Sequence, residues 1–258
     1  MKNILDVMSF QNRKEANKAQ KIKLTDYRKI NKSGVVLRFL FECAIKLEMK
    51  PLTSASAAII YHRFYKEVET ADYDEYLIAA SALYLAVKIK DEPIKIRDVI
   101  NVAHSTLNRG APPLELGDEY WSMRDAIVQA ELLIARTLKF DLNFEHPHKF
   151  LLYYMSTLKD WLGPNIWNSV PAAKTAASFL QDFHHSPKIL NHKVNHIAAC
   201  CLSLSLQTYG IQVPLSDESD DTSMWYLPFV TDLSKEKHWE IIEDIIEVYK
   251  QEAVINAY

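Results

Sequence analysis

Residues 77–88 read LIAASALYLAVK, and residues 196–207, which lie 119 places further along the chain, read HIAACCLSLSLQ. Five of the twelve aligned positions are identical. The same offset aligns a second window with these identical pairs: Ala57 and Ala176, Ala58 and Ala177, Phe64 and Phe183. Both quoted stretches are apolar on nearly every side and rich in small residues, which is typical of a helix at the centre of a bundle. The two windows together predict an internal repeat.

The remaining periodicity predicts an all-α fold of two tandem five-helix bundles. In the first half, apolar residues recur at helical spacing in residues 34–47, 53–67, 74–88, 94–103 and 118–138. In the second half, they recur in residues 147–162, 171–183, 194–209, 224–230 and 234–253. Pro51, Pro93 and Gly163 separate neighbouring segments, and Thr53 or Ser54 is expected to cap the second helix. The fifth helix is expected to pack through Trp121, Ile127, Val128, Leu132, Ala135 and Leu138.

Composition excludes several classes of function. Glycine is scarce, with 5 residues in 258, and neither GxGxxG nor GxxxxGK[ST] occurs, so nothing predicts a nucleotide-binding loop. The cysteines, Cys43, Cys200 and Cys201, form no CxxC pair, which argues against disulfides and structural zinc. We therefore expect a reducing compartment, the cytoplasm or nucleus. The amino terminus lacks an apolar signal core, and the longest apolar run is about half of a membrane span, so no membrane association is expected.

Charge divides the chain unevenly. Residues 1–32 carry nine Lys/Arg and three Asp/Glu, a net charge of +6, which leaves −9 for the rest of the chain. These residues also lack long apolar periodicity, so we interpret them as a basic, flexible arm. The expected organisation is this arm, a first bundle over residues 33–143 and a second over residues 144–258.

Several motifs resemble the cyclin family. LAVKIKD (85–91) is similar to the cyclin motif of small residues followed by a lysine, and ELLIARTLKFDL (131–142) is similar to the cyclin segment that runs from a glutamate to Phe-Asp-Leu. TSASAAIIYHRFYKE (53–67) and HPHKFLLYY (146–154) resemble transcriptional cyclins. Within the family, WxxRDxIVQxELL (121–133) and the HPHK junction resemble the cyclin Q branch. The resemblance covers about residues 34–255 and implies a cyclin fold.

The resemblance also implies a function. A cyclin activates a cyclin-dependent Ser/Thr kinase without doing chemistry itself, and for the cyclin Q branch the expected partner is the tenth cyclin-dependent kinase. By resemblance, Lys88 would donate to main-chain carbonyls beside the kinase αC helix and Glu131 would accept from kinase amides. Ile89, Leu132, Phe140 and Leu142 would form the apolar part of the surface. Neither a cofactor nor a catalytic residue is implied.

Two departures from the family qualify this expectation. Where mitotic cyclins carry a Met-Arg-x-Ile-Leu patch and a tryptophan, this chain reads VVLRFLFEC (35–43), so substrate docking of the mitotic kind is not expected. Where an acidic pair usually follows the lysine, this chain has Lys90 and Asp91, which would alter partner preference.

Nine histidines raise the question of a metal site. His192 and His196 are four residues apart and His184 lies nearby, but no HExxH motif or cysteine completes a ligand set. We interpret them as core or helix-surface residues, and His146 and His148 as a device that starts a helix between the repeats. The acidic residues Asp217, Glu218, Asp220 and Asp221 lack the turn glycine of a calcium loop.

Two rival functions stay open from the sequence. General transcription factors of the B type pair two cyclin folds to bind nucleic acid, but such binding needs a basic face, and the body of this chain is acidic. An all-helical enzyme would need a nucleophile, base and orienting group, and the spacing of residues assembles no such set.

Overall fold

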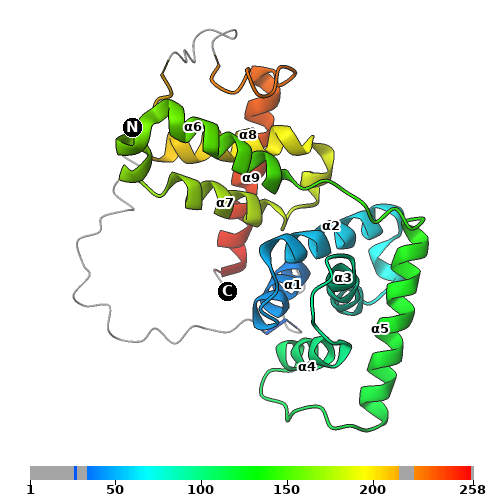
Figure 1. Cartoon of the computed structure of the whole chain (residues 1–258). Helices are drawn as coiled ribbons and strands as arrows, with labels where there is room; N and C mark the ends of the chain where they lie inside the picture. The colour runs from blue at the N-terminus through cyan, green and yellow to red at the C-terminus, as the bar shows by residue number, and fades with distance from the viewer. Residues whose placement is uncertain (1–25, 28–33, 215–223, 257–258) are drawn as a thin grey trace, which may run out of the picture.

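The first half of the chain forms a bundle of five helices (Figure 1). The computed structural model describes residues 26–27, 34–214 and 224–256, and side chains up to residue 251. The bundle consists of α1 (Val35–Lys46), α2 (Pro51–Glu67), α3 (Glu75–Ile89), α4 (Ile96–Leu107) and α5 (Asp118–Thr137). The second half forms α6 (Pro147–Ser169), α7 (Ala172–Phe183), the short 3₁₀ helix η3 (Pro187–Asn191), α8 (Val194–Thr208) and α9 (Lys235–Asn256). No described residue lies in a β-strand, which confirms the all-α prediction.

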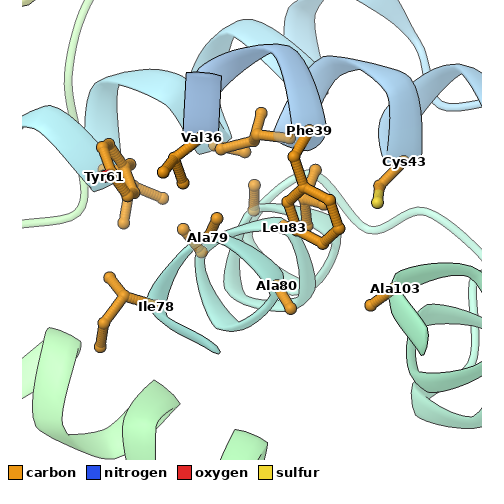
Figure 2. Packing of buried hydrophobic residues seen from close by; sticks show 14 of the residues in the cluster. Val36, Phe39, Cys43, Tyr61, Ile78, Ala79, Ala80, Leu83 and Ala103 are labelled. Atoms are coloured by element: carbon orange, nitrogen blue, oxygen red, sulfur yellow. The ribbon is translucent and has the colours of Figure 1, made fainter. Parts of the chain in front are cut away.

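The helix α3 lies at the centre of the first bundle, as predicted. Asp74 caps its start, because the carboxylate accepts from the backbone N–H groups of Tyr76 and Leu77 at 2.8 and 3.0 Å. Figure 2 shows α3 nearly end-on, with Ala79, Ala80 and Leu83 buried among the side chains of α1, α2 and α4. Small side chains let the surrounding helices approach closely. Helix α5 packs along the remaining side of α3.

The helix α8 plays the same part in the second bundle. Its buried apolar residues belong to a separate core with residues of α6, α7 and α9. The hydroxyl of Ser205 donates to the carbonyl of Ala172 on α7 at 2.7 Å, so a buried polar group on this helix is satisfied by a neighbouring helix. The correspondence between α3 and α8 is the one that the repeated sequence windows predicted.

Several element boundaries differ from the sequence-based expectation. Helix α2 begins at Pro51, not at a Thr53 or Ser54 cap, because proline fits the first turn, where its missing N–H is not needed. Helix α4 continues to Leu107. Residues 224–230, expected to form a short helix, form turns, with Val230 N donating to Tyr226 O at 2.9 Å. Gly163, at φ 76°, interrupts α6 with a kink, and the helix resumes beyond it to Ser169.

The helix α2 lies between the two bundles. Its residues Ala57, Ile60 and Phe64 belong to the first core. On its other side, Ser56 Oγ contacts His146 Nε2 at 2.9 Å, and His62 Nε2 donates to the carbonyl of His184 at 2.9 Å. Helix α2 also packs against η3. This double burial explains why eleven of its seventeen residues are buried, a degree that a one-sided amphipathic helix would not reach.

One described residue of the predicted arm is fixed on the first bundle. Tyr27 is buried, packs edge-on against Phe39 at 5.6 Å between ring centroids, and accepts a hydrogen bond at its carbonyl from the Tyr76 hydroxyl at 2.9 Å. Tyr27 therefore packs on the first bundle, and the flexible arm as a whole stays a prediction. The other residues of the arm, apart from Asp26, lie outside the described ranges, as does most of the acidic loop.

The cysteines and the helix lengths complete the description. Cys43, Cys200 and Cys201 are free thiols, each buried in a bundle core, and burial raises the pKa of the Cys43 thiol to about 12. Among the described helices, none combines the length and the apolar character that crossing a membrane requires.

Candidate partner-binding surface

Lys88 and Glu131 form an ion pair on the surface of the first bundle. Lys88 lies in the last turn of α3 and Glu131 lies on α5, which packs beside it. The ammonium nitrogen is 2.7 Å from Oε1 and 2.8 Å from Oε2 of the carboxylate, and it also lies 4.5 Å from the centre of the Tyr84 ring. The lysine side chain is half exposed, whereas that of Glu131 is 14% exposed. The two charges predicted to contact a partner therefore sit together.

The pair leaves hydrogen-bonding capacity for a partner. An ammonium group has three donors, and the two short contacts to Glu131 leave at least one proton directed elsewhere. A carboxylate has about four acceptor positions, so Glu131 can still accept from backbone amides. The carboxylate holds Lys88 in one orientation, so part of the side-chain entropy is already lost before a partner binds.

The four predicted apolar residues differ in exposure. Phe140 is 63% exposed and Leu132 is 45% exposed, so both present apolar surface to solvent. Ile89 and Leu142 are half-buried and pack against the first core. Ile89 and Leu142 therefore expose a smaller fraction of their side chains than Leu132 and Phe140 do.

Two further exposed residues continue the surface along α5. Trp121 is 52% exposed and Val128 is 42% exposed, although the sequence analysis assigned both to the packed face. Trp121, Val128 and Leu132 are spaced by seven and four residues and share one side of the helix. The packed side is made by Tyr120, Ile127, Ala130 and Ile134. The sequence held one signal for this exposed surface: α5 carries two apolar arcs, and packing in a bundle requires only one of them.

The turn after α5 presents Phe140 in an unusual backbone conformation. Lys139 and Phe140 have φ of 54° and 58°, in the left-handed region that bulky residues rarely adopt. Backbone hydrogen bonds close the turn, among them Phe140 N to Ala135 O at 2.8 Å. Strained backbone of this kind persists where the surroundings enforce it and is concentrated at functional sites.

Arg63 of α2 holds this turn, and sequence reasoning missed it. Its guanidinium donates to the carbonyl of Asp141 at 2.9 Å and to the Asp141 carboxylate at 2.7 Å. The guanidinium also lies 5.8 Å from the centre of the Phe144 ring. The two residues are 78 positions apart, so no local pattern signals the contact. This contact ties the turn that carries Phe140 to α2.

The two family departures have clear structural settings. Asp91 has φ 53° and is exposed in the turn that ends α3, while Lys90 Nζ lies 6.0 Å from the centre of the Phe144 ring. The following residue, Glu92, accepts hydrogen bonds from the Thr53 hydroxyl and from Lys50 N, the latter at 3.3 Å. Its negative charge therefore offsets the positive end of the helix dipole at the start of α2. In VVLRFLFEC the apolar side chains are buried: Val35, Val36, Leu37, Phe39, Leu40, Phe41 and Cys43.

Two groups of described residues have the composition of a metal site. His146, His148 and His184 each offer a nitrogen within 4.8 Å of the others, and His192, Glu240 and Asp244 form a similar group. Neither group is apparent from the sequence, and the first joins residues of one short motif to a residue 36 positions away. Spacing alone could not bring them together.

Comparisons with known proteins agree with this architecture. Residues 4–143 match the family model described as the cyclin N-terminal domain. The chain is 30% identical over 217 residues to Cyclin-K of Danio rerio, covering 83% of this chain and 48% of the relative. It is 27% identical over 220 residues to Cyclin-T1-5 of Arabidopsis thaliana, covering 84% of this chain and 36% of the relative. The chain thus spans half or less of the length of these curated relatives.

Solved structures show the same fold. A chain of the yeast RNA Pol II CTD kinase CTDK-1 complex superposes with a TM-score of 0.63 at 19% identity, over 87% of this chain and 67% of the other. A chain of the CAK complex of Chaetomium thermophilum bound to ATP-gamma-S gives a TM-score of 0.58 at 18% identity, over 85% and 62%. At these identities the likeness concerns the fold alone.

Proposed function

Because the chain belongs to the cyclin family and is of the transcriptional type, we propose that it binds and activates a cyclin-dependent Ser/Thr protein kinase. The kinase-binding surface is formed by Lys88, Glu131, Ile89, Leu132, Phe140 and Leu142. Phosphoryl transfer is carried out by the kinase, and the chain acts as its regulatory subunit. Curated relatives named as cyclins and a fold shared with chains of kinase complexes support this proposal.

The mechanism is a shift in the population of kinase conformations. Catalysis in these kinases requires a strand lysine paired with a glutamate of the αC helix, together with an ordered activation loop. A subunit that binds this active arrangement more tightly than the inactive one raises its population. Moving a conformation from 1% to 99% requires about 5.5 kcal/mol of differential affinity. A surface with a preformed charge pair and exposed apolar anchors suits this task, because few of its groups must be ordered on binding.

One observation supports the site above all others. The bidentate Lys88–Glu131 pair lies where α3 and α5 meet, next to an exposed leucine on α5, and a strained turn after α5 exposes a phenylalanine. A soluble bundle gains nothing in stability from exposing Leu132 and Phe140. Aromatic residues are instead enriched at interfaces between proteins.

The finer proposal concerns which kinase is bound. The segments WSMRDAIVQAELL (121–133) and HPHKFLLYY (146–154) resemble the cyclin Q branch, for which the tenth cyclin-dependent kinase is the expected partner. Part of the first segment forms the exposed side of α5. We therefore propose this kinase as the first partner to test.

The decisive experiment uses an exchange of the two charges. Lys88→Ala/Glu131→Ala removes the pair, whereas Lys88→Glu/Glu131→Lys keeps an internal ion pair and inverts the charges offered to a partner. Peptide phosphorylation by the purified tenth cyclin-dependent kinase is measured with each variant and with the wild type, and circular dichroism and thermal melting report the fold.

The wild type is expected to activate the kinase strongly, and both double variants are expected to lose activation. Loss of a desolvated interface charge costs about 2–5 kcal/mol, which corresponds to at least roughly thirtyfold weaker binding. The exchanged variant is expected to melt like the wild type, because the internal pair is retained. Activation that survives the exchange would contradict this binding surface. Failure to activate any cyclin-dependent kinase, combined with salt-dependent DNA binding, would favour the nucleic-acid-binding alternative.

A further inference from the structure

Three histidines meet at the junction of the two bundles. His146 precedes α6, His148 lies in its first turn, and His184 follows α7. Their rings lie 6.0 Å apart for His146 and His148 and 5.5 Å apart for His148 and His184, measured between ring centroids. His184 is fully buried and His146 is 7% exposed. One nitrogen of each residue lies within 4.8 Å of one nitrogen of the other two.

Hydrogen bonds fix the tautomer of His184. Its Nδ1 lies 2.7 Å from the carbonyl oxygen of Leu180, and a carbonyl can only accept, so Nδ1 carries the proton. In a neutral imidazole, Nε2 is then an unprotonated acceptor. This Nε2 is buried and has no hydrogen-bond partner among the described residues.

The same reasoning fixes the tautomer of His146. The Ser56 hydroxyl donates its only proton to the carbonyl of Leu52 at 2.7 Å. Ser56 Oγ must therefore accept from His146 Nε2, which lies 2.9 Å away. The unprotonated nitrogen of His146 is then Nδ1, which is buried and lacks a partner in the described structure. His148 Nδ1 is a third buried nitrogen without a hydrogen-bond partner in the described part of the chain.

The electrostatic setting keeps these imidazoles neutral. Burial lowers the pKa of His184 to about 3, with a further contribution from His148. Burial lowers the pKa of His146 to about 4, helped by the nearby charge of Lys90. Burial also lowers the pKa of His148, and a contact with Gln181 opposes that shift. Neutral imidazole is the form that binds transition metals, with its other nitrogen held by an outer hydrogen bond.

We propose that His146, His148 and His184 bind one divalent transition-metal ion, Zn²⁺, through these three unpartnered nitrogens. Three histidines plus one open position are an established zinc arrangement. Zn–N distances of about 2.0–2.1 Å place tetrahedral ligand nitrogens about 3.4 Å apart, so nitrogens within 4.8 Å of one another need to approach by at most about 1.4 Å. The Ser56 and Leu180 contacts supply the outer hydrogen bonds that orient ligating histidines. The ion would link the start of α6 to the end of α7 beside α2.

The second acidic and histidine group is not proposed as a site. Asp244 accepts from His192 Nε2 at 2.8 Å and from Lys188 Nζ at 2.6 Å. The Lys188 ammonium already neutralises this carboxylate, and the same ammonium would repel a metal cation placed there.

Metal titration of the full chain, prepared without a polyhistidine tag and stripped with a chelator, tests the proposal. Zn²⁺ affinity is measured by competition with a chromophoric chelator, and Co²⁺ is followed by its visible absorption. The test variants are His148→Ala and His148→Gln, since this histidine is the least buried of the three. Two controls are His104→Gln, on α4 and outside both groups, and Glu240→Gln, in the second group.

The wild type is expected to bind one equivalent of Zn²⁺ and to melt at a higher temperature with Zn²⁺ than with Mg²⁺. The His148 variants are expected to lose at least about tenfold in affinity, and the controls are expected to stay within about twofold. Binding below one equivalent in the wild type, affinity unchanged in the His148 variants, or affinity lowered by Glu240→Gln would overturn the proposal. If the His148 variants do not fold, X-ray absorption of the Zn²⁺-loaded wild type decides. Scattering from three imidazoles supports the site, and scattering from one or none overturns it.

Discussion

At the scale of the residue, Glu42 joins three parts of the first bundle. Its carboxylate accepts from the Tyr27 hydroxyl and from Arg109, each at 2.6 Å, and pairs with Lys46 of the same helix at 2.9 Å. Burial alone would raise the pKa of Glu42, but the hydrogen bonds from Tyr27, Lys46 and Arg109 outweigh it and lower the pKa. A carboxyl group with a lowered pKa in the folded state stabilises the fold above its unfolded pKa.

We predict that Glu42→Gln lowers the free energy of unfolding by about 1–3 kcal/mol at pH 7, since it weakens hydrogen bonds to a charged acceptor. The wild type should lose this advantage as the pH falls below the unfolded value of 4.5 and through the lower folded pKa. Urea unfolding at pH 7 and pH 3 measures the difference, with Glu67→Gln, an exposed residue of α2, as the control. An equal deficit at both pH values would contradict the role of the charge.

The contacts made by single residues of the proposed binding surface could be predicted only in part. Lys88 and Glu131 were identified through a family motif, and the structure brings them together as an ion pair across 43 positions. Nothing local predicts that pairing, and the same holds for the contact of Arg63 with Asp141. The three-histidine group shows the same limit, because local spacing says nothing about residues joined by tertiary packing.

At the scale of the element, the sequence predicted best the helices with strong patterns. The central helices α3 and α8 end within two residues of the expected ends, because small-residue runs and the Asp74 cap mark them clearly. Residues 224–230 were expected to be helical, since apolar side chains recur there. In the structure, Tyr226 and Val230 are buried side chains carried by a series of turns. Short apolar segments of this kind fit helix or turn equally well.

The turn after α5 allows a prediction that separates stability from activity. Phe140→Gly removes the cost of a bulky residue in the left-handed region, about 1–2 kcal/mol, and adds a smaller entropy to the unfolded chain. We expect the variant to be more stable by up to about 1 kcal/mol and to activate the kinase less well, because the exposed ring is lost. Thermal melting and peptide phosphorylation measure the two effects.

The matched control for this turn is Phe140→Ala, which removes the ring and keeps a side chain at positive φ. It should lose activation to the same extent without the gain in stability. If Phe140→Gly activated the kinase as well as the wild type does, the ring would have no place in the binding surface.

At the scale of the whole molecule, the repeat was predictable and the junction was not. The two aligned windows predicted that α3 and α8 each organise a core, and the structure has two separate apolar cores around them. The domain boundaries proposed from sequence, at residues 33 and 144, stay a prediction. Hydrogen bonds from α2 and the packing of Phe41 of α1 against the His185 ring, 4.4 Å away, join the bundles. The second buried face of α2 cannot be told from ordinary helix core in the sequence.

Ile59 tests how strongly the junction couples the two bundles. Its side chain is 6% exposed and lies outside the first core, beside a cavity that Ile189 and Ile197 of the second half also line. An asparagine there would bury a polar group whose desolvation costs about 1–3 kcal/mol, and this cost falls on the contact between the bundles. We predict that the wild type unfolds in one calorimetric transition and that Ile59→Asn unfolds in two, with a calorimetric enthalpy larger than the van't Hoff enthalpy. Leu52→Asn, at an exposed position of the same helix, should keep the single transition. A single transition in Ile59→Asn at an unchanged temperature would mean that the bundles are coupled elsewhere, through the histidine contacts of Ser56 and His62.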